Sequence, residues 1–167
     1  MNEVVEKNPL SRSEQASKII RNYSLGSMVP SLMPVPLLDL AAVTGIQLKM
    51  LHSLSQVYGV EFKEELSRAA ISSLIGGTVA LSAARVVSSA AKAIPGIGSL
   101  VGAATMPVIS GGTTYALGQV FTQHFESGGT FLSFDAAKVR AYFEQQLAEG
   151  KALVAAAKSS GDPAKPK

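Results

Sequence analysis

The two histidines of this chain, His52 and His124, are the first residues to consider for acid–base or metal chemistry. A zinc site takes histidine, cysteine or carboxylate ligands at characteristic spacings along the chain. Neither histidine has such a spacing to the other or to an acidic residue. Cysteine is absent, which removes thiolate nucleophiles and cysteine ligands. We therefore predict that both histidines pack against or cap helices, and we expect no catalytic residue and no metal site.

A glycine-rich run, Gly96-x-Gly98-x-x-x-Gly102, superficially resembles a dinucleotide-binding turn. Such a turn must follow a strand within a β–α–β unit, whereas a helical stretch rich in serine and alanine precedes this one. The sequence also has no G-x-x-x-x-G-K-[ST] phosphate loop, no G-x-S-x-G nucleophile elbow and no H-E-x-x-H zinc motif. The sequence thus predicts a chain that is not an enzyme and binds no cofactor.

Small residues instead recur every four positions along two apolar stretches. Side chains at this spacing share one face of a helix, and small ones let two backbones approach closely. Ile94-Pro95-Gly96 lies between the two stretches and would end one helix and turn the chain. The pattern predicts a tight antiparallel hairpin of the glycine-zipper kind. Its helix-packing residues are Ser72, Gly76, Ala80, Ala84 and Ser88 on the first helix, and Gly98, Gly102, Ser110, Thr114 and Gly118 on the second.

Start and stop signals divide the chain into about five helices. Ser11 and Glu14 have the spacing of a capping box, Gly59 is a suitable C-terminal cap, and Ser133 is the expected cap of the last helix. Strand patterns are short and unconvincing, so the predicted fold class is all-α, with the hairpin at its centre. The first four helices are predicted over residues 11–26, 37–58, 61–93 and 97–125. We expect a polar lead-in over 1–10, a single helical domain over 11–158 and a disordered tail over 159–167.

Charge is unusually scarce in this composition. Charged residues make up 16% of the chain, against a usual quarter, and the mean hydropathy is +0.25. Such a chain must cover its apolar surface in a bilayer, in an oligomer or in a well-covered bundle. The net charge of +3 is spread out, without interleaved aromatic residues, so we expect no nucleic-acid partner. The N-terminus has no apolar signal region, so we expect the chain on the cytoplasmic side.

The hairpin is long enough to raise the question of membrane insertion. Residues 93–123 contain no Asp, Glu, Lys or Arg and could cross a hydrocarbon core of roughly 30 Å. Arg85 interrupts the partner helix and would cost about 2.5–3.5 kcal/mol at its centre. Spanning, peripheral association and a wholly soluble bundle all stay open at this point. The aromatic residues near one end would suit an interfacial anchor; they are Tyr115, Phe121, Phe125, Phe131 and Phe134.

Pro34-Val35-Pro36, followed by Asp39, Gln47 and Tyr58-Gly59, resembles the bacterial domain-of-unknown-function family 697. The turn at 94–98 and the segment 113–118 are similar to that family too, and the resemblance covers roughly residues 19–146. It implies a membrane-associated helical module, of the kind often fused to or encoded beside Era-like GTPases. This chain lacks a GTPase domain, so nucleotide hydrolysis would belong to a partner. The family provides no catalytic residues to carry over.

Asp39 and Gln47 interrupt an otherwise apolar helix. They either satisfy nearby backbone groups or make a polar contact that locks a neighbouring helix or faces a partner.

The leading functional hypothesis is a non-enzymatic, membrane-associated helical module that self-assembles or docks a GTPase. We expect membrane lipids, an Era-like GTPase and further copies of the chain as partners. The expected location is the cytoplasmic side of the inner membrane, integral or peripheral. Two alternatives from other classes remain: a membrane-inserting or pore-forming protein, and a soluble helical carrier of an apolar ligand.

Overall fold

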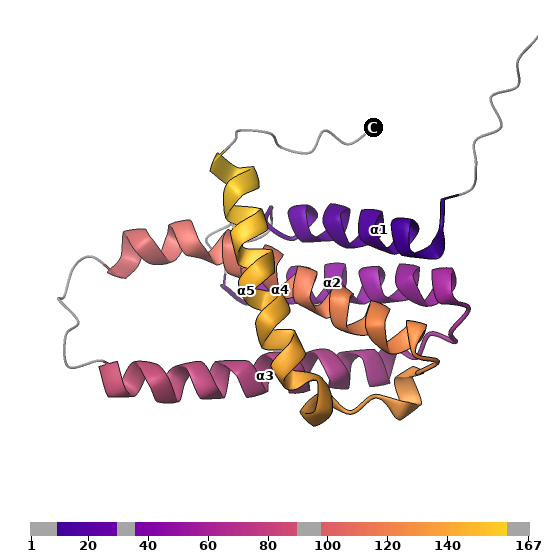
Figure 1. The fold of residues 1–167 in the computed structure, drawn as a ribbon. Helices are drawn as coiled ribbons and strands as arrows, with labels where there is room; N and C mark the ends of the chain where they lie inside the picture. The colour runs from indigo at the N-terminus through magenta and orange to yellow at the C-terminus, as the bar shows by residue number, and fades with distance from the viewer. Residues whose placement is uncertain (1–9, 30–35, 90–97, 160–167) are drawn as a thin grey trace, which may run out of the picture.

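Five α-helices and one short 3-10 turn make up the described part of the chain (Figure 1). The computed structural model describes the backbone over residues 10–29, 36–89 and 98–159, and the side chains over 10–29, 41–77 and 106–159. No strand occurs in these residues, and the all-α fold class is confirmed. The predicted turn at Pro95 and most of the expected lead-in and tail lie outside them. The elements are α1 (Arg12–Gly26), α2 (Pro36–Tyr58), α3 (Glu64–Ser89), α4 (Gly98–Glu126), η3 (Phe131–Ser133) and α5 (Ala136–Ser159).

The start of α1 confirms the predicted capping box. The Ser11 hydroxyl accepts a hydrogen bond from the Glu14 backbone N–H at 3.2 Å, and the Glu14 carboxylate accepts one from the Ser11 N–H at 2.8 Å. These two bonds satisfy donors that no intrahelical carbonyl can reach. Because the bonds from Ser11 favour the charged carboxylate, they lower the pKa of Glu14.

Glycines end α2 and α4 in the same way. Gly59 has a φ of +69° and Gly128 a φ of +80°, a left-handed conformation that side chains with a Cβ disfavour. After α2, the Val60 N–H donates to the Ser55 carbonyl at 2.8 Å, which is the bond typical of a Schellman cap. The cap predicted at Gly59 is confirmed. Both glycines redirect the chain at the same end of the bundle.

The start of α5 differs from the prediction. Ser133 belongs to η3, and its hydroxyl accepts from the Thr130 N–H at 3.0 Å. Asp135 caps α5 instead, because its carboxylate accepts the Ala137 N–H at 3.0 Å. The prediction of Ser133 as the cap was therefore wrong. The 3-10 turn that contains Ser133 begins at Phe131, which is buried in the core.

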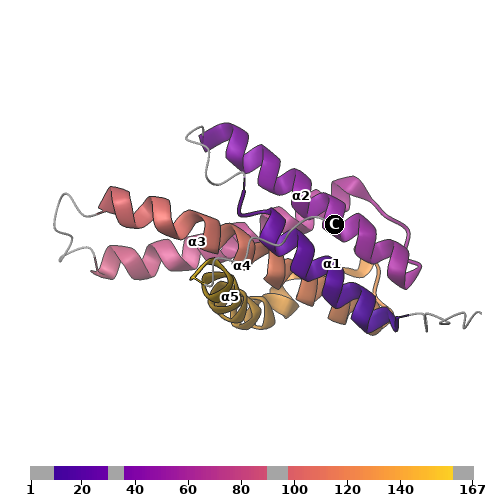
Figure 2. The ribbon, with the colours of Figure 1, turned by 90° about the horizontal axis from the view of Figure 1, so that it is seen from above.

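The helices α1, α2 and α4 form one bundle, with α3 beside it and α5 across it (Figures 1 and 2). Tyr23 on α1 meets Ser53 on α2, with the two hydroxyls 3.3 Å apart. Tyr58 at the end of α2 donates to Glu126 at the end of α4 at 2.8 Å. Helix α5 packs most extensively on α4, and α3 packs on α5 and α2. In Figure 1, α3 and α4 both extend beyond α5 toward the left.

The core combines aliphatic residues of all five helices with an aromatic cluster near η3. Phe121 lies parallel to Phe134, with ring centroids 4.5 Å apart, and Phe131 lies edge-on to Phe125 at 5.2 Å. Phe121, Phe125 and Phe131 are at most 5% exposed. The interpretation of these three rings as a membrane-interface anchor was therefore wrong, since they pack on one another inside the protein.

Candidate functional site

Both histidines are engaged by aromatic rings. His52 on α2 lies 4.7 Å from Phe62 between ring centroids, and His124 on α4 lies edge-on to Phe134 at 5.3 Å. The Nε2 atom of His124 is 2.9 Å from the Thr130 carbonyl oxygen, which can only accept, so Nε2 carries the proton in this arrangement. Over the described side chains, no three His, Asp or Glu residues are placed to hold a metal ion. The geometry gives both rings packing and capping roles.

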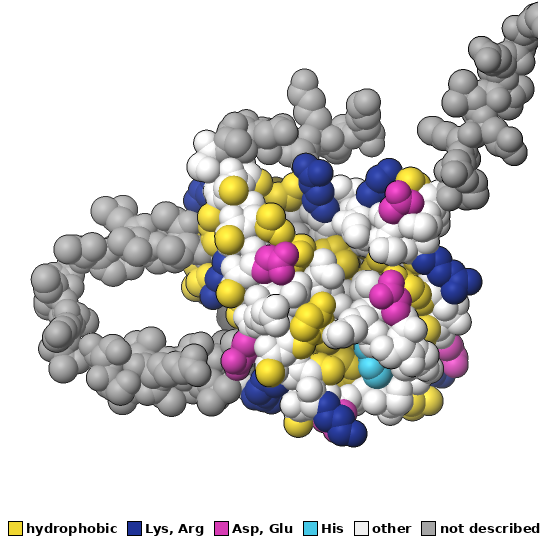
Figure 3. Space-filling view, in the orientation of Figure 1, with side chains coloured by type: hydrophobic (Ala, Val, Ile, Leu, Met, Phe, Trp, Pro, Cys, Tyr) yellow, Lys and Arg dark blue, Asp and Glu magenta, His cyan; other side chains and the backbone are white. Residues whose placement is uncertain are grey.

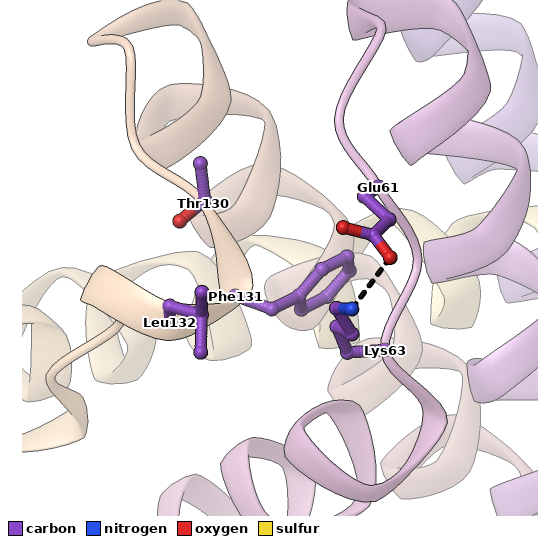
Figure 4. Close-up of a pocket in the computed structure, with 5 residues that line it drawn as sticks. All are labelled: Glu61, Lys63, Thr130, Phe131 and Leu132. Carbon is purple, nitrogen blue, oxygen red and sulfur yellow. Dashed lines mark hydrogen bonds and ion pairs between the residues drawn. The ribbon is translucent and has the colours of Figure 1, made fainter.

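A shallow surface pocket lies where the α2–α3 connection meets η3 (Figure 4). Its cavity volume is about 90 Å³. Lys63 and Glu61 form an ion pair on one side, and the exposed Leu132 lies on the other. Thr130 and Phe131 complete the lining. With one exposed ion pair and no nucleophile, acid–base pair or metal-ligand set in its lining, this pocket has no evident catalytic chemistry.

The described small residues of the predicted hairpin divide into two groups. On α4, Gly118 lies so close to Ile20 of α1 that an added Cβ would be 2.6 Å from its Cγ1. On α3, by contrast, Ser72 and Gly76 are exposed, and a Cβ on Gly76 would meet nothing within 4 Å. The side chains of Ala80, Ala84, Ser88, Gly98 and Gly102 lie outside the described set. Close packing of α3 against α4 therefore stays a prediction.

Glycines that the four-residue pattern did not include bring the backbones of two helices close together. A Cβ on Gly150 of α5 would lie 2.9 Å from the Gly112 carbonyl oxygen of α4, and one on Gly112 would lie 2.9 Å from the Lys151 nitrogen. A Cβ on Gly111 would lie 2.9 Å from Cγ1 of Val154. The adjacent pair Gly111-Gly112 was the available signal in the sequence. The four-residue pattern predicted that α4 packs on α3, and it missed the crossing of α4 with α5.

A buried polar seam joins α1, α2 and α4. Gln47, which is 1% exposed, donates from Nε2 to the Thr114 hydroxyl at 3.3 Å, and Thr114 donates in turn to the Ser110 carbonyl at 3.0 Å. The Ser110 hydroxyl donates to the Ser27 carbonyl at 2.9 Å. The Oε1 atom of Gln47 has no hydrogen-bond partner among the described atoms. Gln47 thus contacts a neighbouring helix, whereas the side chain of Asp39 lies outside the described set.

Four helix segments with almost no charge extend toward one side of the molecule (Figure 1). Within residues 22–48 the only charged residue is Asp39, and within 69–123 the only ones are Arg85 and Lys92. We call this the charge-poor end; it comprises the end of α1 through Val29, the first half of α2, the second half of α3 and the first half of α4. The Ser110–Ser27 and Gln47–Thr114 contacts join α1 and α2 to the middle of α4, and Figure 1 shows α3 extending beyond α5 on the same side as α4.

Large apolar side chains are exposed next to this end. Val29 after α1 is 65% exposed, and Met106 and Ile109 on α4 are 55% and 41% exposed. On the described face in Figure 3, acidic and basic side chains are scattered rather than gathered into one patch. Within the ranges that could be searched, no helix combines the length and the apolarity needed to cross a bilayer.

Comparison with known proteins gives one curated relative and one family. The chain is 46% identical over 145 residues to Magnetosome membrane protein 22 of Magnetospirillum gryphiswaldense, and the match covers 86% of this chain and 74% of that protein. No solved structure matches the chain significantly. The family described as Domain of unknown function (DUF697) matches residues 2–152. Because the family model matches nearly the whole chain, this protein belongs to the DUF697 family.

Proposed function

We propose that this chain is a non-enzymatic helical module that works at a membrane surface or within the membrane. The observation that carries the proposal is its similarity to a relative named as a magnetosome membrane protein, at 46% identity over most of both chains. The charge-poor end supports it physically, because an end with few charges loses little hydration free energy when it leaves water. The sequence motifs excluded above support the non-enzymatic part.

Vesicle flotation of the purified full chain tests membrane association. We expect the protein to rise through a density gradient with vesicles of phosphatidylcholine and phosphatidylglycerol and to stay at the bottom without them. A protein that remains at the bottom in both cases, while circular dichroism shows it helical, contradicts the proposal. Flotation of an unrelated soluble helical protein in the same gradient controls for trapping.

Two finer parts of the proposal concern protein partners. Self-assembly is supported by the scarcity of charged surface, because exposed apolar area favours association of copies. Analytical ultracentrifugation in mild detergent tests it, and a monomer at all concentrations contradicts it.

Docking of an Era-like GTPase is supported by the family resemblance described above. A pull-down with such a GTPase, loaded with GDP or with a non-hydrolysable GTP analogue, tests this part. Equal background binding in both nucleotide states and to unrelated GTPases contradicts it.

The location proposed for the module is the cytoplasmic face of the inner membrane. Protease treatment of spheroplasts and of inverted vesicles tests this, since only the inverted vesicles should expose the protein. Carbonate extraction then separates integral from peripheral attachment.

A further inference from the structure

The side of α5 that points away from α4 is exposed but carries no charge. We call this side the outer face of α5; its residues, all exposed, are Ala141, Gln145, Ala148, Ala152, Ala155 and Ser159. Gly150, which lies against α4, is on the opposite side of the helix. The exposed side of a helix ordinarily carries charged residues, as α1 does with Glu14, Lys18 and Arg21. The outer face of α5 therefore lacks what a surface in permanent contact with water usually has.

The spacing along the outer face is that of a helix that pairs with another helix. Its residues follow one another at steps of four, three, four, three and four, which is the 3.5-residue repeat of a coiled-coil seam. The repeat runs from Ala141 to Ser159, over roughly 27 Å at 1.5 Å per residue. Small side chains on such a face let two backbones approach closely. The face alone does not identify its partner, but the charges beside it do.

Charged residues flank the outer face at the positions that select a partner in coiled coils. Glu144 and Lys151 lie on one flank, seven residues apart, and Glu149 lies on the other. Among the described residues, neither Glu144 nor Lys151 forms an ion pair. Two parallel helices bring opposite flanks together, which would place Glu144 near Glu149 of a second copy. Two antiparallel helices bring like flanks together, so that Glu144 lies beside Lys151 of a second copy.

We propose that two copies of this chain pair through the outer faces of α5, with the two helices antiparallel. This inference rests on the self-assembly part of the proposed function and names the surface that carries it. When nearly the whole of α5 overlaps with its copy, Ala141 is level with Ala152 of the second copy. The same register pairs Glu144 with Lys151, and the two-fold symmetry of the dimer makes each of these contacts twice. Helix α5 lies on one side of the bundle, where it is accessible to a second copy (Figure 2).

A second copy fits the outer face better than lipid does. Glu144, Glu149 and Lys151 stand directly beside the face, and immersion of α5 would carry these charges toward hydrocarbon at a high cost. The alanine side chains also have little apolar area to gain from the transfer. In an antiparallel dimer the flanking charges stay at the rim of the interface, in contact with water and with opposite charges.

A charge placed in the outer face tests the interface. Sedimentation equilibrium of the full chain in mild detergent gives the dimer dissociation constant. Ala152→Glu should raise that constant at least about tenfold, because it buries two like charges in the interface. Ala69→Glu is the matched control and should leave it unchanged, since Ala69 is an exposed alanine on α3. Thermal melting by circular dichroism checks that both variants fold.

An exchange of charges tests the pairing of Glu144 with Lys151. Glu144→Lys or Lys151→Glu alone should raise the dissociation constant about threefold or more, because each variant replaces two attractive contacts with repulsive ones. The double variant Glu144→Lys/Lys151→Glu should return to within about twofold of the wild type, since opposite charges meet again. Failure of the double variant to recover would contradict the proposed register.

Disulfide cross-linking tests the orientation, because the chain contains no cysteine. A mixture of Ala141→Cys and Ala152→Cys chains should form a covalent dimer that contains one chain of each kind under mild oxidation. Either variant alone should form none, because its two cysteines lie at opposite ends of the pair. Efficient cross-linking of each variant with itself would show parallel helices and overturn the proposal.

The failures of this inference and of the proposed function can be told apart. A wild-type chain that is monomeric at every concentration contradicts both the dimer and the self-assembly part. A dimer that Ala152→Glu leaves intact contradicts the outer face of α5 as the interface, while self-assembly stands. Vesicle flotation of the wild type and of Ala152→Glu judges membrane association separately, and loss of flotation in Ala152→Glu alone would assign the face to lipid and overturn the proposal.

Discussion

Gly150 of α5 lies directly against the backbone of Gly112 of α4, so that a Cβ on Gly150 would be 2.9 Å from the Gly112 carbonyl oxygen and 2.8 Å from Cβ of Tyr115. Real Cβ atoms rarely approach backbone atoms this closely, and the backbone cannot move aside as the tip of a long side chain can. This crossing fixes α5 across the bundle (Figure 2).

Gly150→Ala should destabilise the protein by about 1–3 kcal/mol, because the added methyl group forces the two helices apart. The matched control is Gly76→Ala on α3, where a Cβ meets nothing within 4 Å. That change should stabilise by up to about 1 kcal/mol, since alanine favours the helix. Urea unfolding followed by circular dichroism measures both. A stabilising effect at both positions would show that the crossing is not tight.

Gln47→Met should leave the free energy of unfolding unchanged or raise it by about 1 kcal/mol. The substitution removes a buried Oε1 atom that has no partner, while the Thr114 hydroxyl keeps its bond to the Ser110 carbonyl. Gln47→Ala should instead cost about 2 kcal/mol, because it leaves a cavity. Chemical denaturation of the two variants compares them. A large loss for Gln47→Met would show that the polar contact itself stabilises the bundle.

Phe121→Ala should cost about 3–5 kcal/mol, as expected for a large ring removed from a core. Phe121 is fully buried and stacks on Phe134 at 4.5 Å between centroids. Leu132→Ala serves as the control and should change stability by less than about 0.5 kcal/mol, because Leu132 is 78% exposed. Thermal unfolding distinguishes the two. Similar effects for both would contradict the placement of the aromatic cluster in the core.

Alkaline titration should find the phenol of Tyr58 ionising well above its ordinary pKa of 10. Burial and then the hydrogen bond to the Glu126 carboxylate raise the pKa of Tyr58 to about 12. Because the folded value exceeds the ordinary value of 10, the stabilising contribution is complete below pH 10 and is lost as the pH rises toward 12. The difference in phenolate absorbance between wild type and Tyr58→Phe measures this step. Glu126→Gln should move it toward pH 10, and an unchanged midpoint would contradict the role of the carboxylate.

The ends of the helices were predictable from sequence to the extent that their signals are local. The Ser11–Glu14 box and the Gly59 cap each depend on atoms a few residues apart, so residue type and spacing determine them. Ser133 was misassigned because a second acceptor, Asp135, follows two residues later and caps α5, whereas the Ser133 hydroxyl bonds with Thr130 in the 3-10 turn.

The partner of a small-residue face was not predictable in the same way. A repeat of small side chains shows that another backbone can approach, but it carries no information on which one does. Gly118 receives Ile20 of α1, and the Gly111-Gly112 pair receives α5. The aromatic residues were ambiguous for the same reason, since a cluster in sequence suits both a membrane interface and a core. The scarcity of charge, in contrast, could be read directly from the composition.

The Tyr58–Glu126 bond and the aromatic cluster fasten α2, α4 and η3 at the end opposite the charge-poor end. Helix α5 crosses α4 near the middle of α4, where Gly150 lies against Gly112. The described contacts therefore hold the molecule together at two places, the end where Tyr58 meets Glu126 and the crossing of α4 with α5.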